Sequence, residues 1–246
     1  MLNLERATGL VIRGTDFSET SRISTLWTRE FGKIRALAKG GRRLRSNFDS
    51  AFDLLNVCQV VFIRKSSGLD LLTEARLEER FPELRTDLHA LYAGYYVAEL
   101  LDATQDYDPH PRLYDAALAM LRTIAEPERD RLGAVSAFEL VWLRELGYSP
   151  RLTACAACDR DLLPEAQHRL GFSPAGGVVC ESCLGTTRDH RPLSGAAWAA
   201  LRDLNEGRSE LPSGVRREVR GHLSQTVSFV LGRRPRLAGY IDGTGP

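Results

Sequence analysis

The chain has 246 residues, of which 43% are hydrophobic and 26% are charged, and a formal net charge of +1. These values are ordinary for a globular protein of one large domain or two to three small ones. No stretch approaches the ~20 apolar residues of a membrane span. Residues 1–13 hold no long apolar run, so we expect no secretory leader and a cytoplasmic location.

The small net charge hides an asymmetry along the chain. Residues 1–68 carry 12 Lys and Arg against 6 Asp and Glu, whereas the remaining residues carry 21 against 26. Such an asymmetry predicts that the N-terminal part meets a polyanion.

Residues 1–80 are rich in short β-prone runs separated by turn residues. The runs fall at about 6–17, 21–30, 33–39, 54–64 and 69–77. Gly32 separates the second run from the third, as a tight hairpin requires. Five short strands with little room for a helix predict a small closed barrel. An OB-type barrel is the leading candidate, although an SH3-like barrel would look similar.

The third run and the residues after it form a basic hairpin arm, residues 30–45, without an acidic residue from Gly32 to Asn47. Because side chains alternate in a strand, Lys33, Arg35 and Lys39 share one face and Ile34 and its small apolar neighbours the other. We expect an outward row of cations that are not paired locally, followed by Arg42, Arg43 and Arg45 on a loop. The row favours binding of a nucleic-acid backbone. The alternative is a solvated basic face without a ligand.

Three aromatic residues near these cations are candidate stacking platforms for bases. They are Trp27, Phe31 and Phe48, and we favour a core position for Trp27 because it alternates with Ile23 and Thr25.

From Pro82 onward the hydrophobic period becomes helical. A first helix is expected to bury a face with Leu84, Leu88, Leu91, Tyr92 and Tyr95. Pro111 opens a second helix, and a third ends at Gly147. Two more helices complete the chain, with Ser194 and Ser213 as expected N-caps and Gly232 as the final stop.

Two Cys-x-x-Cys pairs interrupt the helical region, with 21 residues between them. The expected ligands are Cys155, Cys158, Cys180 and Cys183. Two such turns that face each other make a tetrahedral four-thiolate cage of the kind Zn²⁺ prefers, although the gap is one residue beyond the usual range. Four protein ligands leave no open position for a reactive water, so we expect a structural metal. The alternatives are two disulfides, which need an oxidising compartment, or a redox-active pair.

We therefore predict an α+β, multidomain fold. An N-terminal five-stranded OB-type β-barrel occupies residues 1–80, and a helical domain occupies 81–149 and 189–246. A four-cysteine zinc module, residues 150–188, is inserted in the helical domain.

A second group of arginines lies near the C-terminus, on or just after the last expected helix. It comprises Arg216, Arg217, Arg220, Arg233, Arg234 and Arg236. An ordinary solvated helix face explains this group at least as well as a second DNA contact.

A metal-dependent nuclease is the rival class of function. Its candidate ligands are Asp102, Asp106, Asp108, His110 and the pair Asp189-His190. Clustered carboxylates and His can bind catalytic metals, but Asp next to Pro109 and Pro111 is also common in turns. An RNA-binding zinc-ribbon protein is the third alternative, because a barrel that follows the backbone need not distinguish sugars.

The residues also carry a resemblance to a known family. The runs Gly9–Glu19 and Leu26–Arg43 look like the N-terminal barrel of RecO recombination mediators, and Leu69–Ala75 fits the closing strand of that barrel. Leu143–Pro150 is similar to the family's entry to the zinc module, and Leu231–Pro235 matches its tail. Ser18-Glu19 departs from the family's expected Gly-Glu at the first turn.

The resemblance implies a non-enzymatic bacterial repair factor of the RecF-type pathway, associated with the nucleoid. It implies binding of single- and double-stranded DNA, annealing of complementary strands, and loading of RecA together with RecR and the single-stranded-DNA-binding protein. The implied DNA contacts at matching positions are Arg13, Lys33, Arg35, Lys39, Arg42 and Arg43.

Overall fold

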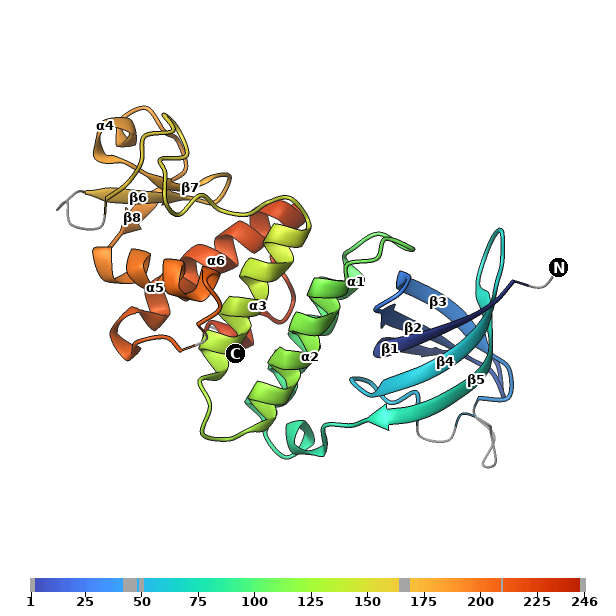
Figure 1. Cartoon of the computed structure of the whole chain (residues 1–246). Coiled ribbons are helices and arrows are strands. Elements are labelled where there is room, and N and C mark those ends of the chain that lie inside the picture. The colour runs from blue at the N-terminus through green and yellow to red at the C-terminus, as the bar shows by residue number, and fades with distance from the viewer. Residues whose placement is uncertain (1–2, 42–47, 49–50, 164–168, 209, 244–246) are drawn as a thin grey trace. The chain divides into compact units, whose positions relative to one another are not determined.

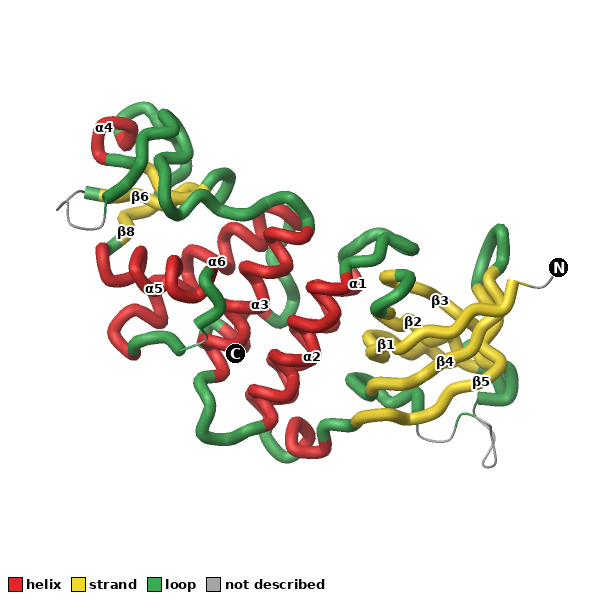
Figure 2. The backbone as a smooth tube through the Cα atoms, in the orientation of Figure 1, coloured by secondary structure: helices red, strands yellow, loops and turns green. Residues whose placement is uncertain are grey.

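The computed structural model describes residues 3–41, 48, 51–163, 169–208 and 210–243 (Figure 1). The chain divides into two compact units, residues 1–121 and 122–246. All strands of the first unit precede its helices (Figure 2). This order confirms the predicted α+β class.

Five strands of the first unit close into a barrel, in the order β1-β2-β3-β5-β4. Their bounds are Asn3–Asp16 for β1, Arg22–Thr28 for β2, Gly32–Ala38 for β3, Val57–Arg64 for β4 and Asp70–Glu79 for β5. The 14-residue β1 pairs antiparallel with both β2 and β4, which closes the barrel. Only β3 and β5 pair in parallel among these strands. All five expected strands are therefore present, with their ends shifted by a few residues.

Alternate residues of the strands fill the barrel interior. Ile34, Ala36 and Ala38 of β3 are fully buried and pack with Leu26 and Phe62 in one hydrophobic core. Trp27 is also fully buried, as expected. The alternation predicted for the third strand is confirmed on its apolar side.

Gly32 at the β2–β3 turn meets two constraints that exclude a side chain. Its φ of +68° lies in the left-handed region, and a Cβ atom there would lie 2.1 Å from the carbonyl oxygen of Asp108. The Thr28 hydroxyl donates to the Gly32 carbonyl at 2.8 Å and closes the turn. Glycine therefore allows the segment around Asp108 to lie directly against the barrel.

The helical part of the first unit begins with a short 3-10 turn, Pro82–Arg85, followed by α1, Leu88–Asp102. Helix α2, Pro111–Ala125, begins in the first unit, and its last four residues belong to the second. The face predicted for α1 is wrong at Leu88, which is exposed, whereas Leu84 is buried and its other three members are half-buried. The fully buried positions of the helix include Ala90, Val97 and Leu101. The helix starts at Asp87, whose side chain caps the amides of His89 and Ala90, so its register differs from that of a helix begun at Pro82.

Helices α3, α5 and α6 form the core of the second unit. They span Arg131–Glu145, Gly195–Asn205 and Arg216–Leu231, and short α7 spans Ala238–Ile241. Helix α3 packs against both α5 and α6. Ser194 caps α5 as expected, since its hydroxyl accepts from the Ala197 amide, and Gly232 ends α6 with a φ of 66°.

The cap predicted at Ser213 is wrong. Ser213 begins a 3-10 turn that ends at Val215, and α6 starts after it without a side-chain cap. The 3-10 turn occupies the positions expected for the first turn, so α6 begins at Arg216, two residues later than a cap at Ser213 predicts.

The cysteine-bearing segment of the second unit is built on a small antiparallel sheet with the order β7-β6-β8. Its strands are Leu170–Ser173 (β6), Gly177–Val179 (β7) and Arg191–Leu193 (β8), and α4 spans Glu181–Leu184. The indole of Trp198 on α5 donates to the Leu152 carbonyl at 2.6 Å, which ties the segment to the helices of its unit.

Within the described ranges, no helix combines the length and apolar character that a membrane crossing demands.

Candidate metal centre and nucleic-acid surface

The four cysteines of the two Cys-x-x-Cys pairs converge on one point. Their sulfur atoms all lie within 4.8 Å of one another, and the Sγ atoms of Cys158 and Cys180 are 3.8 Å apart. Sulfurs about 2.3 Å from a tetrahedral zinc ion would be separated by about 3.8 Å. None of the five cysteines is joined in a disulfide, and the distance between the sulfurs of Cys158 and Cys180 is far beyond an S–S bond, which contradicts the disulfide alternative. The cluster can hold a metal ion.

Backbone amides support negative charge on this cluster. The amides of Cys180 and Ala157 point at the sulfur of Cys155 from 3.3 and 3.4 Å. Burial raises the pKa of the Cys155 thiol, but these amide hydrogen bonds and one from Cys158 outweigh burial and hold the pKa at about 6. Hydrogen bonds to the neighbouring thiols raise the pKa of Cys183 to about 12. A metal ion held by these sulfurs would favour their deprotonated form, as ligation requires.

The first two residues of the predicted basic row, Lys33 and Arg35, both have carboxylate partners. The side chain of Lys33 is 10% exposed, and its Nζ donates to the Asp102 carbonyl at 2.6 Å and lies 3.3 Å from Oδ1 of Asp106. The Arg35 guanidinium makes an ion pair with Asp106 at 2.8 Å but remains 59% exposed. Among the described residues the row has no local partners, as expected, but these two cations are not left unneutralised, because carboxylates from a segment about 70 residues away pair with both. The outward position predicted for Lys33 is wrong, since the residue is nearly buried.

Two further arginines of the barrel have partners in the same helical segment. Arg13 on β1 lies 3.5 Å from Asp102, with 66% of its side chain exposed. Arg29 makes two parallel hydrogen bonds to Asp115 on α2, at 3.0 and 3.1 Å. Carboxylates from α1, α2 and the loop between them thus partly neutralise the outer side of β1, β2 and β3.

Hydrogen bonds and a cation–π contact, in addition to ion pairs, hold the loop between α1 and α2 against the barrel. The amide of Tyr107 donates to the Lys33 carbonyl at 2.9 Å, and the Tyr107 hydroxyl makes a short hydrogen bond to Asp70. The Arg64 guanidinium lies 4.0 Å from the centre of the Tyr107 ring. Burial and the bond to Asp70 raise the pKa of Tyr107 far above its usual range. Asp106 is therefore held against Lys33 by a fixed loop.

This arrangement also accounts for the acidic residues proposed for a nuclease. Asp102 and Asp106 face barrel cations, and Asp108 lies 3.2 Å from His110. His190 contacts the carbonyl of Thr187. Among the residues that the structure describes, only the four cysteines bring three or more metal-ligating groups together.

Lys39 differs from the other cations of the row. It follows the last residue of β3, is exposed, and makes no ion pair with any described residue. Arg42, Arg43 and Arg45, the cations predicted beyond it, lie outside the described residues. The candidate stacking residue Phe48 is buried against Phe52, and Phe31 packs edge-on against Phe62 at 5.6 Å.

Comparison with known proteins decides the family. A model described as Recombination protein O N terminal matches residues 1–81, and one described as Recombination protein O C terminal matches residues 85–237. The chain belongs to the RecO family. It is 37% identical to the DNA repair protein RecO of Rhodopirellula baltica, over 94% of this chain and 97% of that protein. The corresponding values for Anaeromyxobacter dehalogenans RecO are 34%, 98% and 97%.

RecO membership confirms the resemblance inferred from the sequence and makes this chain a DNA repair protein with a general role in recombination. The matches cover nearly the whole chain, including both cysteine pairs and the basic hairpin arm. The barrel surface and the thiol cluster are therefore parts of one RecO protein.

The C-terminal arginines of this RecO chain fall into two kinds. Arg216 lies 3.3 Å from Asp130, and Arg220 is only 3% exposed in contact with Glu139 and Asp242. Arg217 is exposed and makes no ion pair within the described residues. Burial thus keeps Arg220 away from the surface, whereas Arg216 keeps 42% of its side chain exposed beside its ion pair.

Two candidate residues were missed by the sequence reasoning. Phe17 is exposed in the β1–β2 turn, and Lys65 is exposed in the β4–β5 turn. Both residues stand in polar turns between predicted strands, where an aromatic ring or a lysine is a candidate for ligand contact. Only the strand order of the barrel shows that these two turns flank the same end of β3.

Proposed function

We propose that this RecO protein binds the sugar–phosphate backbone of DNA, single- and double-stranded, through one edge of its barrel and anneals complementary strands. The barrel is assigned to the OB type. Its strand order and its parallel β3–β5 pairing support this assignment, because a five-stranded Greek-key barrel of this type binds oligonucleotides beside strands 2 and 3.

The observation that carries the proposal is the position of Lys39. Its neighbour Ala38 pairs with Arg22 on β2 and with Leu72 on β5. Lys39 therefore lies between the β1–β2 turn with Phe17 and the β4–β5 turn with Lys65. In OB barrels these two turns border the nucleic-acid groove. An exposed aromatic ring and cations at such an edge suit a single strand.

The cations proposed to contact phosphates are Arg13, Arg35, Lys39, Arg42, Arg43 and Arg45. Arg13 and Arg35 are largely exposed, and exposed ion pairs contribute only about 0–1 kcal/mol, so phosphate can compete for them. Lys33 is proposed to act differently from the expectation, as a buried counter-charge for Asp102 and Asp106. It keeps the neighbouring carboxylates from cancelling Arg35 completely.

Annealing by such a surface needs no catalytic group. Two DNA strands repel each other through their phosphates, and cations that neutralise both strands lower the cost of bringing them together. Contacts to phosphates carry no sequence information, which suits a repair factor that acts at any sequence.

We assign structural Zn²⁺ to Cys155, Cys158, Cys180 and Cys183. When bound, the metal would cross-link a segment whose strands have only three or four residues. Four thiolates fill a tetrahedral site, so no position is left for a reacting water. This assignment makes the metal a contribution to folding and leaves the non-enzymatic role unchanged.

Family membership supports the remaining partners as proposals. They are RecR and the single-stranded-DNA-binding protein, with loading of RecA as the outcome, in the bacterial cytoplasm at the nucleoid. We also propose three domains: a barrel at residues 1–80, a helical domain at 81–149 and 189–246, and a zinc module at 150–188. This division is finer than the two compact units of the structure.

Annealing of labelled complementary strands tests the function. The double variant Arg35→Ala/Lys39→Ala should anneal strands at least about tenfold more slowly than the intact chain at moderate salt. Arg76→Ala removes an exposed cation on β5 of the same barrel and serves as the matched control. Equal rates for all three proteins would refute the barrel surface. Shortened strands in Mg²⁺ would favour a nuclease, and preference for matched RNA strands would favour the RNA-binding alternative.

A further inference from the structure

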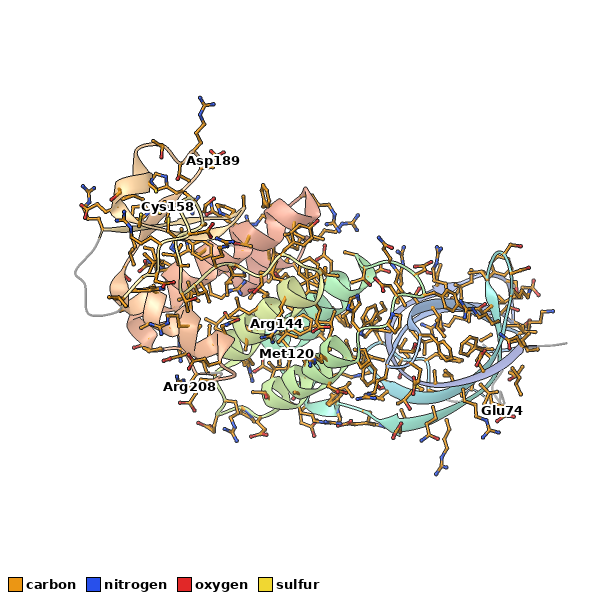
Figure 3. The ribbon with its side chains drawn as sticks, turned by 45° about the horizontal axis from the view of Figure 1, so that its top comes forward. Glu74, Met120, Arg144, Cys158, Asp189 and Arg208 are labelled. Atoms are coloured by element: carbon orange, nitrogen blue, oxygen red, sulfur yellow. The ribbon has the colours of Figure 1, made fainter. Side chains whose placement is uncertain are left out.

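The second unit contains a basic cavity of about 840 Å³ that lies apart in sequence from the barrel contacts. Its walls come from the turn after β6, from the segment between α4 and β8, and from α6 with the residues that follow it. Six arginines line it, namely Arg188, Arg191, Arg217, Arg220, Arg233 and Arg234. Only two carboxylates, Asp189 and Asp242, share the lining (Figure 3 labels Asp189).

One of the two carboxylates is already neutralised. Asp242 accepts from Arg220 at 3.1 Å, from Arg234 at 3.2 Å and from the Ser224 hydroxyl at 2.8 Å. Arg220 is 3% exposed and also binds Glu139 on α3, so its position is set by the core of the unit. The floor of the cavity is therefore a fixed polar network with no spare negative charge on Asp242.

The rim of the cavity has the opposite character. Arg188, Arg191 and Arg217 are exposed, and none of them makes an ion pair with a described residue. Arg188 precedes β8, Arg191 is the first residue of β8 and Arg217 lies on α6, and the fold brings the three to one opening. Like charges gathered in this way repel each other, and binding of an anion relieves the repulsion.

An exposed aromatic ring lies in the same lining. Phe229 on α6 is exposed, one helical turn after Gln225, which also lines the cavity. Arginine guanidinium groups bind phosphates with two parallel hydrogen bonds and stack on flat rings, and aromatic rings stack on bases. Cations along an opening together with a stacking ring are the combination found in channels for single strands.

We propose that this cavity is a second binding site for the phosphate backbone of single-stranded nucleic acid, separate from the barrel edge. An acidic peptide would meet the same arginines. The nucleic acid is favoured because the cations come from several segments around an open cavity and an exposed ring stands beside them, as a chain of phosphates and bases requires. The proposal rests on the proposed annealing function and gives each RecO chain a place for each of two strands.

Gly221 provides a test that spares the fold. It lies within α6 in the cavity lining, and no atom lies within 4 Å of the position that a Cβ would take. Gly221→Glu places a carboxylate among the arginines, whereas Gly221→Gln adds nearly the same volume without charge. Both changes replace a helix-interior glycine by a better helix former.

The full-length protein is titrated with a fluorescent oligonucleotide, and the number of strands bound per chain and the annealing rate are measured. The intact chain should bind two short strands. Gly221→Glu should weaken the second strand and slow annealing at least about tenfold through like-charge repulsion, while Gly221→Gln stays within about twofold. Arg191→Ala/Arg217→Ala should reproduce the loss with an unchanged melting temperature.

The outcomes separate this site from the barrel site. If the intact chain anneals strands and Gly221→Glu does so equally well, the cavity site is refuted and the proposed function stands. If the intact chain neither binds nor anneals strands, the proposed function itself fails. Binding of an acidic peptide that Gly221→Glu abolishes, with oligonucleotide binding unchanged, would overturn the assignment to nucleic acid.

Discussion

The ammonium group of Lys33 on β3 lies 3.3 Å from the carboxylate of Asp106, in the loop after α1, and Asp106 also holds Arg35 at 2.8 Å. One loop carboxylate therefore serves a buried cation and an exposed cation at the same time. The two cations should respond in different ways to substitution, because only the exposed one can meet a phosphate.

Replacing Lys33 should change stability more than DNA binding. Lys33→Met removes a nearly buried charge and leaves Asp102 and Asp106 with only the exposed Arg13 and Arg35 as counter-ions. The expected cost is about 2–3 kcal/mol in the free energy of unfolding, below the full value for a buried pair because both carboxylates are partly exposed. Urea denaturation measures the loss. Lys39→Ala is the matched comparison, with a change in unfolding free energy below about 0.5 kcal/mol and weaker binding of single strands. The reverse pattern would show that Lys33 is the contact residue.

Removing the shared carboxylate should strengthen DNA binding. Asp106→Asn deletes one negative charge beside Arg35, so affinity for single strands should rise about threefold to fivefold at low salt and lose this gain at high salt. Fluorescence anisotropy over a salt series measures the effect. Asp53→Asn, which removes the partner of Arg85 elsewhere in the unit, is the control and should leave affinity unchanged. Weaker binding by Asp106→Asn would contradict this prediction. It would mean that the ion pairs of Asp106 are needed to hold Arg35 and the loop in the positions that bind DNA.

The salt dependence of binding counts the phosphates that the barrel edge neutralises. Six contacts predict that log K for a single strand falls with log[salt] with a slope of about −4, since each phosphate contributes about −0.7. Each of Arg35→Ala and Lys39→Ala should reduce the slope by about 0.7. These slopes are best measured in the Gly221→Glu variant, in which the second site is expected to bind a strand weakly. A slope near zero for the intact chain would refute an electrostatic mode of binding.

Loss of the metal should unfold part of the second unit before it affects the barrel. Cys155→Ser or Cys180→Ser should lower zinc content from one ion per chain, reduce solubility and lower the melting temperature, because structural zinc contributes about 10–16 kcal/mol in isolated fingers. The affinity of a short oligonucleotide for the barrel should change by less than about twofold.

Cys58 offers the control for the metal experiment. It is buried in the barrel core, far along the chain from the thiol cluster, so Cys58→Ala should keep one zinc ion per chain. Zinc content measured by elemental analysis distinguishes the two classes of variant. An unchanged melting temperature in Cys155→Ser would contradict a structural metal.

Features that depend on residues close together in the sequence were predictable from the sequence alone. The alternation of Ile34, Ala36 and Ala38 with polar residues follows from the two-residue period of a strand, and it correctly assigned the inner side of β3. The Cys-x-x-Cys pairs brought their own local geometry, so the four-thiol cluster was correctly located. Helix periodicity was less reliable, because the cap at Asp87 changed the register of α1.

Charge pairing and cavity composition depended on contacts between distant segments, which packing alone decides. No property of residues 30–45 indicates that Asp102 and Asp106 will neutralise Lys33 and Arg35, because those carboxylates arrive only when α1 packs on the barrel. Likewise, Arg188 and Arg191 meet Arg217 only after the cysteine-bearing sheet folds beside α6. Hydrophobic periodicity encodes which side of an element is buried, but a charge has a range of several ångströms and acts on whatever the fold places beside it.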